Sequence, residues 1–144
     1  VVGMASLVIG IFELNRYRIN GQAEEIVSDR SNWSDYSDEK LNQAINDKKP
    51  VIIDFYADWC AACHELDKYV FSTSEFKDQT KEIVLLKFDA TKDSEVLKDL
   101  KKKYQIKGLP TVIFYNNKGE LKSELTLTEF EKKEAFFKRL EKLK

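Results

Sequence analysis

Residues 51–71, V-I-I-D-F-Y-A-D-W-C-A-A-C-H-E-L-D-K-Y-V-F, decide the fold of this chain. The first six are dominated by Val, Ile, Phe and Tyr, which is the composition of a buried strand. Residues 57–59 predict a turn, and the apolar residues that follow Cys63 recur at helical spacing. The stretch therefore predicts a strand, a short turn and a helix, with Cys60 at the helix N-terminus and Cys63 one turn further along.

This placement of the two cysteines favours redox chemistry. The thiolate is the species that attacks a disulfide, and a free cysteine titrates at about pH 8.5, so a nucleophilic cysteine needs a stabilised thiolate. The unpaired N–H groups and the positive dipole end of a helix supply that stabilisation at Cys60. Cys63 is then placed to resolve a mixed disulfide by attacking Cys60.

The composition of the chain argues against several other functions for the two cysteines and for the domain. The chain has 144 residues and is 42% hydrophobic, which is enough for one domain with a core. Its net charge of −1 gives no indication of nucleic-acid binding. With only two Cys and one His, it lacks the four ligands of a closed zinc site and the cysteines of a disulfide framework, so no metal is expected.

A haem site is an alternative interpretation of the same cysteines. The pentapeptide C-A-A-C-H matches the attachment motif of c-type haem, in which His64 would be the proximal ligand. By residue type, the other candidate for a second axial ligand is Met4, far up the chain. A redox dithiol is the favoured interpretation, and a Soret band in the visible spectrum would identify the haem-carrying electron-transfer module instead.

Outside the central stretch, hydrophobic periodicity and capping signals predict the remaining elements. They are a short strand near 32–34, a helix capped by Ser37, a strand at 83–88, a helix capped by Asp93 or Ser94, a strand at 111–115, a hairpin turn at 116–119, a fourth strand at 121–127 and a last helix opened by a capping box at 128–131. This order of strands and helices predicts an α/β domain over residues 32–144.

The string Y-A-D-W-C-A-A-C-H-E-L-D-K-Y-V-F, with Gly108-Leu109-Pro110-Thr111, resembles the active site of the thioredoxin-like family. Within that family it is similar to the C-terminal domains of DsbD-type thiol:disulfide interchange proteins, although His64 stands where a lysine is expected. The resemblance implies a thioredoxin-like fold, with a central mixed sheet flanked by helices. It also implies a monomeric protein-disulfide reductase that needs neither metal nor organic cofactor.

By the same resemblance, a loop beside the cysteines binds the substrate. Pro110 is expected to follow a cis peptide bond and to face the Cys-x-x-Cys motif. The backbone of Leu109 and Thr111 is expected to pair with an extended substrate segment. Trp59 is expected either to pack over the site or to contact the partner.

Two acidic residues are candidates for proton transfer and electrostatic tuning. Asp54 lies in an apolar strand, where a carboxylate is costly to bury unless it has a task; the alternative is a side chain that reaches solvent. The resemblance places Asp54 behind the cysteines, where burial would raise its pKa and let it accept the Cys63 proton. Asp67 is expected near the thiols, with a solvated helix carboxylate as the alternative. Two carboxylates would make Cys60 ionise less readily.

The N-terminal part of the chain is predicted to lie outside this domain. Residues 1–12 carry no charge and are too short to span a bilayer, which needs about 20 residues. They are interpreted as a remnant of a membrane helix or a signal sequence, with an edge strand as the alternative. Residues 13–31 are interpreted as a polar linker.

The predicted function is electron transfer through the Cys60–Cys63 dithiol to partner disulfides outside the cytoplasm, in the periplasm, with attachment to the inner membrane through the segment before residue 13. The partners are expected to include a membrane electron-donor domain. The alternative within the same fold is a free-standing, membrane-tethered protein for cytochrome maturation or thiol repair. Sequence does not give the reduction potential, and so leaves the direction of transfer open.

Overall fold

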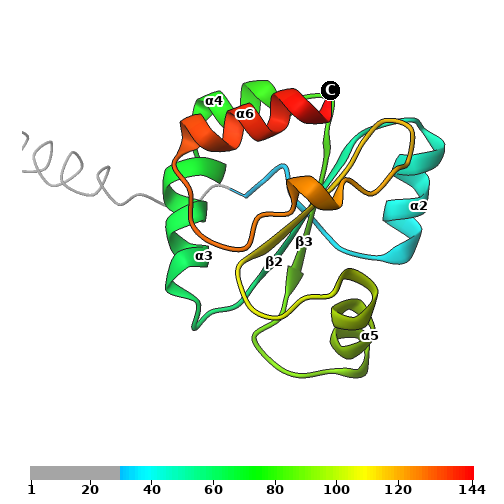
Figure 1. The fold of residues 1–144 in the computed structure, drawn as a ribbon, viewed down its shortest axis with the longest axis vertical. Coiled ribbons are helices and arrows are strands. Elements are labelled where there is room, and N and C mark those ends of the chain that lie inside the picture. Colours follow the sequence, from blue (N-terminus) through cyan, green and yellow to red (C-terminus); the bar gives the residue numbers. More distant parts are fainter. Residues whose placement is uncertain (1–29) are drawn as a thin grey trace, which may run out of the picture.

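A four-stranded mixed sheet forms the centre of the protein in the computed structural model, which describes residues 30–144 (Figure 1). The strands are β1 (Ser34–Asp35), β2 (Val51–Tyr56), β3 (Val84–Asp89) and β4 (Thr111–Tyr115). Their order is β1-β3-β2-β4; β1 and β2 run parallel to β3, and β4 runs antiparallel to β2. The predicted thioredoxin-like fold with a mixed sheet is therefore confirmed.

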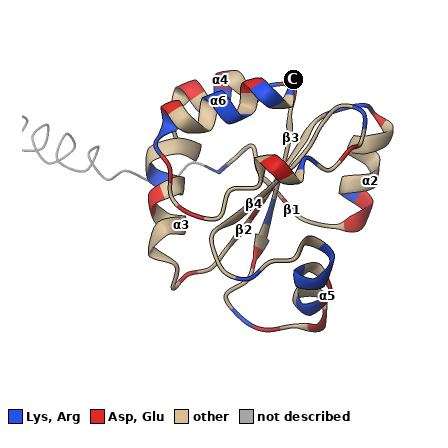
Figure 2. Ribbon diagram, viewed as in Figure 1, with Lys and Arg blue, Asp and Glu red and all other residues tan. Residues whose placement is uncertain are grey.

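Helices cover both faces of the sheet (Figure 1). One face carries α3 (Ala61–Leu66), its continuation in the π-helical turn η1 (Asp67–Phe71), α4 (Ser74–Gln79) and α6 (Lys133–Leu143). The other face carries α2 (Asp38–Asn46) and α5 (Glu95–Tyr104). Figure 2 shows charged residues of both signs along the helices, whereas most of the sheet is uncharged. The protein is thus a three-layer α/β/α domain with a hydrophobic core on each face.

The central strand β2 contributes to both cores. Ile52 packs in the core under α3, whereas Ile53 and Phe55 pack in the core under α2 and α5. Side chains alternate across a strand, which explains why a strand buried on both faces is apolar almost throughout. The same alternation places Asp54 on the face of β2 that is covered by α3.

Two predicted helix caps are confirmed. The Ser37 hydroxyl accepts a hydrogen bond from Lys40 N at the start of α2, and the Ser94 hydroxyl accepts one from Leu97 N at the start of α5. Ser94, rather than Asp93, is therefore the cap of α5.

The predicted fourth strand at 121–127 is wrong. After the turn at 116–119, single bridges join Tyr115 to Leu121 and Val112 to Leu127, and a short 3-10 helix, η2 (Ser123–Leu125), lies between them. The carbonyl of Leu125 accepts a hydrogen bond from Arg139 Nη1 at 2.8 Å. A side chain from α6 therefore satisfies a backbone group that a strand would have paired with its neighbour.

The predicted capping box at 128–131 is also wrong, because α6 begins at Lys133 and its N-cap residue makes no side-chain hydrogen bond. A capping box needs the carboxylate of Glu131 to turn back to the backbone of Thr128. Arg139 instead binds both oxygens of Glu131, at 2.9 and 2.8 Å. A two-point, charge-assisted contact competes successfully with a local backbone hydrogen bond.

The predictions for residues 1–12 and for most of the linker lie outside the described residues. Arg30, near the end of the predicted linker, is described and contacts the domain. Within residues 30–144, no helix is both long enough and apolar enough to cross a membrane.

Candidate active site at the Cys60–Cys63 pair

Cys60 and Cys63 lie where β2 passes into α3, as the sequence predicts. Cys60 is the N-cap residue of α3, with extended backbone angles of φ −94° and ψ 102°. Its Sγ accepts a hydrogen bond from Cys63 N at 3.2 Å. The two residues are joined by a disulfide, with their Cα atoms 5.2 Å apart. The sulfur of Cys60 is therefore aligned with the first amide groups of the helix, which stabilise negative charge there.

Both cysteines are largely buried, at 5% exposed for Cys60 and 6% for Cys63. Leu109 packs against them from the loop before β4, and the peptide bond between Leu109 and Pro110 is cis. The hydroxyl of Thr111 donates to Gly108 O at 2.7 Å and ties the two ends of this loop together. The predicted substrate-binding loop thus lies beside the predicted redox pair.

Asp54 is buried, with 2% of its surface exposed, so the alternative in which it reaches solvent is wrong. Burial raises the pKa of Asp54 from 3.8 to about 6; the Arg30 guanidinium counteracts part of this rise, and the Asp67 carboxylate adds to it. A carboxyl group with a pKa near neutrality can take up and release a proton under physiological conditions.

Arg30 joins the two acidic residues. Its Nη2 lies 2.5 Å from Asp54 Oδ2, and its Nε lies 2.7 Å from Asp67 Oδ1. Asp67 is partly buried and paired, unlike the solvated carboxylate considered as the alternative. Sequence reasoning missed Arg30, because nothing in its local pattern separates it from other polar residues of the predicted linker.

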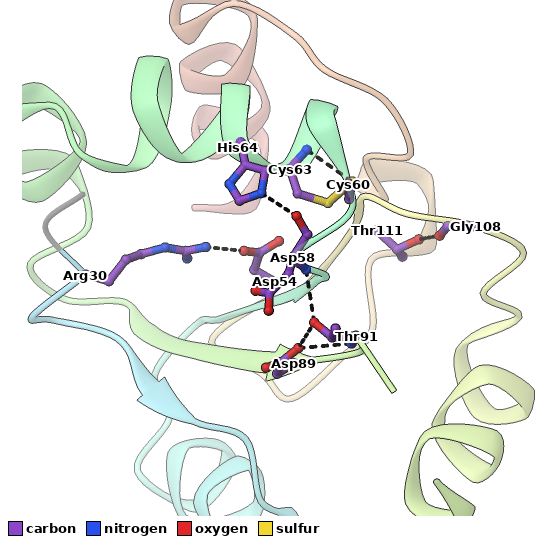
Figure 3. Close-up of a disulfide and its surroundings, with 10 residues drawn as sticks. All are labelled: Arg30, Asp54, Asp58, Cys60, Cys63, His64, Asp89, Thr91, Gly108 and Thr111. Atoms are coloured by element: carbon purple, nitrogen blue, oxygen red, sulfur yellow. Dashed lines mark hydrogen bonds and ion pairs between the residues drawn. A yellow bond between two sulfur atoms is a disulfide. The ribbon is translucent and has the colours of Figure 1, made fainter. Parts of the chain in front are cut away.

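A cleft of about 130 Å³ opens beside the disulfide, and Arg30, Cys63 and Asp67 are among the residues that line it. In Figure 3, the Asp54 carboxylate lies between the Arg30 guanidinium and the cysteine pair. The cleft gives the groups around Cys63 access to solvent, which a proton needs to leave or enter the site.

The family of the chain is shown by comparison with known proteins. The family model for thioredoxin matches residues 33–142. The chain belongs to the thioredoxin family.

Within this family the chain is similar to DsbD proteins. It is 43% identical over 99 residues to the thiol:disulfide interchange protein DsbD of Klebsiella pneumoniae, covering 67% of this chain and 17% of the relative. It is 30% identical over 141 residues to DsbD of Yersinia pestis, covering 96% of this chain and 24% of the relative. The chain therefore spans less than a quarter of the length of these relatives.

A solved structure shows the same similarity. The oxidised C-terminal domain of DsbD from Neisseria meningitidis superposes with a TM-score of 0.66 at 25% identity, covering 77% of this chain and all of that domain. The match identifies the described part of this thioredoxin-family chain as similar to the C-terminal part of a DsbD protein.

Thr91, which the sequence analysis did not identify, holds the turn before Cys60 in place. Thr91 follows β3, and its hydroxyl accepts from Asp58 N at 3.0 Å while donating to Asp89 Oδ1. The carbonyl of Thr91 accepts from the Trp59 indole at 3.3 Å. A lone threonine in a loop gives no sequence signal for this role, which depends on the parallel pairing of β2 with β3.

Trp59 lies on the surface, 67% exposed, and only its indole nitrogen is engaged by Thr91. Most of the ring is therefore available to a partner. His64 is exposed on α3 and donates from Nε2 to Asp58 O at 2.7 Å, which ties the helix back to the turn. Within the described residues, no three His, Cys, Asp or Glu side chains are grouped as a metal site would require.

Proposed function

We propose that this protein is a thiol:disulfide oxidoreductase of the type of the DsbD C-terminal domain, acting through Cys60 and Cys63. The observation that carries the proposal is the position of Cys60 at the N-cap of α3, where its sulfur accepts the amide hydrogen of Cys63 at 3.2 Å. A helix N-terminus stabilises the thiolate that the reaction needs. The matched family and the similarity to interchange proteins support the same function.

The reaction has two steps. The Cys60 thiolate attacks a sulfur of the partner disulfide; a mixed disulfide forms, and the other partner sulfur leaves as a thiolate. Cys63 then loses its proton, attacks Cys60 and releases the second partner sulfur. The partner gains two electrons and ends as a dithiol once its thiolates take up protons from solvent, while this protein ends with the Cys60–Cys63 disulfide found in the structure.

Asp54 is the group that receives the Cys63 proton in this proposal. Its pKa of about 6 lets the carboxylate accept a proton at neutral pH and return it to solvent afterwards. The neighbouring Asp67 adds negative charge, which opposes ionisation of the dithiol and favours a reductant over an oxidant.

Partner proteins bind around Trp59 and the loop that contains Leu109, Pro110 and Thr111. Trp59 offers an exposed aromatic ring next to Cys60, and Leu109 packs directly on the cysteines. Aromatic rings with one polar end are favoured at protein interfaces. An extended partner segment that reaches Cys60 passes both residues.

The partners belong outside the cytoplasm and include a membrane domain that supplies electrons, as in a DsbD-type interchange protein. This choice is supported by the similarity to DsbD of Yersinia pestis, which extends over 96% of the chain and so includes residues before the described domain.

Trapping of mixed disulfides tests the proposed function. Reduced Cys63→Ala protein is expected to hold a partner covalently on Cys60, because the resolving thiol is absent. A model protein disulfide such as insulin serves as the partner, and nonreducing electrophoresis with mass mapping identifies the link. Reduced wild-type protein should release its partner, and Cys60→Ala protein should trap none. Trapping through Cys63 in the Cys60→Ala variant, or no exchange by the wild type, would contradict the proposal.

A further inference from the structure

Arg30 is anchored to the domain by a backbone hydrogen bond and by contacts with aromatic rings. Trp33 N donates to Arg30 O at 3.0 Å, and this turn brings the arginine side chain back over the tryptophan. The guanidinium carbon lies 4.5 Å from the ring centre of Trp33 and 5.0 Å from that of Phe71, both of which are core residues. Such cation–π contacts fix the position of a guanidinium that is only 14% exposed.

The guanidinium divides its hydrogen-bonding edge between two carboxylates. Nη2 contacts Asp54 on β2, and Nε contacts Asp67 at the start of η1. Arg139 shows the more usual arrangement, in which both nitrogens bind the single carboxylate of Glu131. Arg30 therefore acts on a pair of acids that would otherwise repel each other next to the dithiol.

Other titratable or charged groups surround this pair. Tyr56 and Asp58 come from β2 and the turn that follows it, His64 from α3 and Lys87 from β3, and all four line the cleft. Among the described residues, Arg30 is the cation that forms ion pairs with Asp54 and Asp67. It is also the positive charge that lowers the pKa of Asp54, against burial and the charge of Asp67.

We propose that Arg30 is a positioning residue that holds Asp54 as a carboxylate beside the dithiol, next to the side chain of Asp67, so that Asp54 is ready to accept the Cys63 proton. This inference rests on the proposed function and deepens it. In the step concerned, the Cys63 proton passes to Asp54, the Cys63 sulfur bonds to Cys60, and the bond between Cys60 and the partner breaks. Without Arg30, burial and the charge of Asp67 keep the proton on Asp54 at neutral pH, and the base is absent when Cys63 needs it.

A two-phase reaction with a small aromatic disulfide isolates this step. Reduced protein reacts with dithiobis(nitrobenzoate), which releases one thionitrobenzoate when Cys60 attacks and a second when Cys63 resolves the mixed disulfide. The small reagent makes no docking contacts, so the second phase reports the attack by Cys63. Its rate is measured from acidic to alkaline pH for each variant.

Arg30→Gln is expected to move the pH midpoint of the second phase upward. At a pH below both midpoints, a variant whose midpoint lies one pH unit higher reacts about tenfold more slowly in the second phase. At alkaline pH the variant is expected to match or exceed the wild type, since Asp54 is then ionised in both. Arg30→Lys keeps the positive charge but lacks the planar guanidinium that contacts both carboxylates. It is therefore expected to restore most of the wild-type profile.

Asp67→Asn is expected to move the midpoint downward, because it removes the negative charge that raises the pKa of Asp54 and leaves Arg30 to Asp54 alone. Shifts in opposite directions distinguish electrostatic control from general damage, which would slow both variants alike. This arm also tests the inference if Arg30→Gln fails to fold.

Arg139→Gln is the matched control, because Arg139 is also a partly buried arginine in a carboxylate pair but neither lines the cleft nor packs against the cysteines. It is expected to lose stability and to keep the wild-type midpoint. The inference would be overturned if folded Arg30→Gln kept the wild-type midpoint, or if the midpoint of Asp67→Asn did not move downward. Either result would leave the proposed function intact. A wild-type protein that released no thionitrobenzoate would instead refute the proposed function.

Discussion

Helices α3 and α5 begin with the same local geometry and have different tasks. At α3 the Cys60 sulfur accepts the amide hydrogen of Cys63 at 3.2 Å, and at α5 the Ser94 hydroxyl accepts that of Leu97 at 3.1 Å. Both N-cap residues have extended backbone angles, and both use the amide three residues further along. Capping geometry alone therefore does not make a reactive site.

The surroundings of the two caps differ. Cys60 is buried against Ala57 and Leu109 in the turn that follows β2, the strand that carries Asp54. Ser94 is exposed to solvent, and the ion pair in the first turn of its helix is a surface contact. A cap becomes a redox site when it carries a thiol, excludes water and has buried ionisable groups beside it.

Exchanging the reactive atom while keeping the cap gives the largest expected effect. Cys60→Ser retains an oxygen that can accept the Cys63 amide hydrogen, as Ser94 does for α5, but it removes the nucleophile. We expect complete loss of insulin reduction, with circular dichroism and melting temperature close to those of the reduced wild type. Residual turnover by the variant would mean that Cys60 is not the attacking residue.

Asp54, the buried carboxyl group on the strand that leads to α3, should make the stability of the domain depend on pH. The pKa of Asp54 rises from 3.8 to about 6 on folding, so the folded state binds the proton more tightly than the unfolded state. Stability from this group is therefore full below about pH 4 and is lost as the pH rises through about 6, by roughly 3 kcal/mol in total.

Urea unfolding of oxidised wild-type and Asp54→Asn protein between about pH 4 and pH 7 measures this effect. The free energy of unfolding of the wild type is expected to fall relative to that of the variant as the pH rises. A constant difference across this range would show that Asp54 does not titrate there.

Thr91 tests whether the turn before Cys60 needs external support. Thr91→Val removes the oxygen that accepts from Asp58 N and is expected to cost about 1 kcal/mol and slow insulin reduction several-fold. The control is Thr73→Val, which removes the cap of α4 and should cost about as much stability without slowing reduction. Equal reduction rates in the two variants would mean that Thr91 has no role in positioning the site.

The smallest effect is expected at the structural cap. Ser94→Ala is expected to lower the free energy of unfolding by about 1 kcal/mol through the loss of one capping bond. Insulin reduction and the pH profile should remain those of the wild type. A slower reduction would show that α5 contributes to the site and would weaken the contrast between the two helices.

Local signals in the sequence were sufficient for the elements around the cysteines. The apolar run of β2, the turn and the spacing after Cys63 all agree, and the caps at Ser37 and Ser94 use side chains next to the groups they satisfy. Where each local preference matches the final fold, the pattern predicts the structure.

Prediction failed where a distant side chain replaced a local partner. Arg139 binds Glu131 and the carbonyl of Leu125, so neither the capping box nor the fourth strand forms. Arg30 reaches Asp54, 24 residues away along the chain, and a single sequence gives no sign of that contact. The contacts of long charged side chains are therefore the part of the site that local sequence patterns do not predict.

In the proposed reaction Cys60 attacks the partner disulfide and Cys63 resolves the mixed disulfide. The exposures of the two residues, 5% and 6%, do not distinguish them, so any preference has to come from the hydrogen bond and the helix N-terminus at Cys60. Brief alkylation of the reduced protein followed by mass mapping measures this preference directly. We expect the label on Cys60 well before Cys63. Labelling of Cys63 first, or of both cysteines at equal rates, would contradict the assignment.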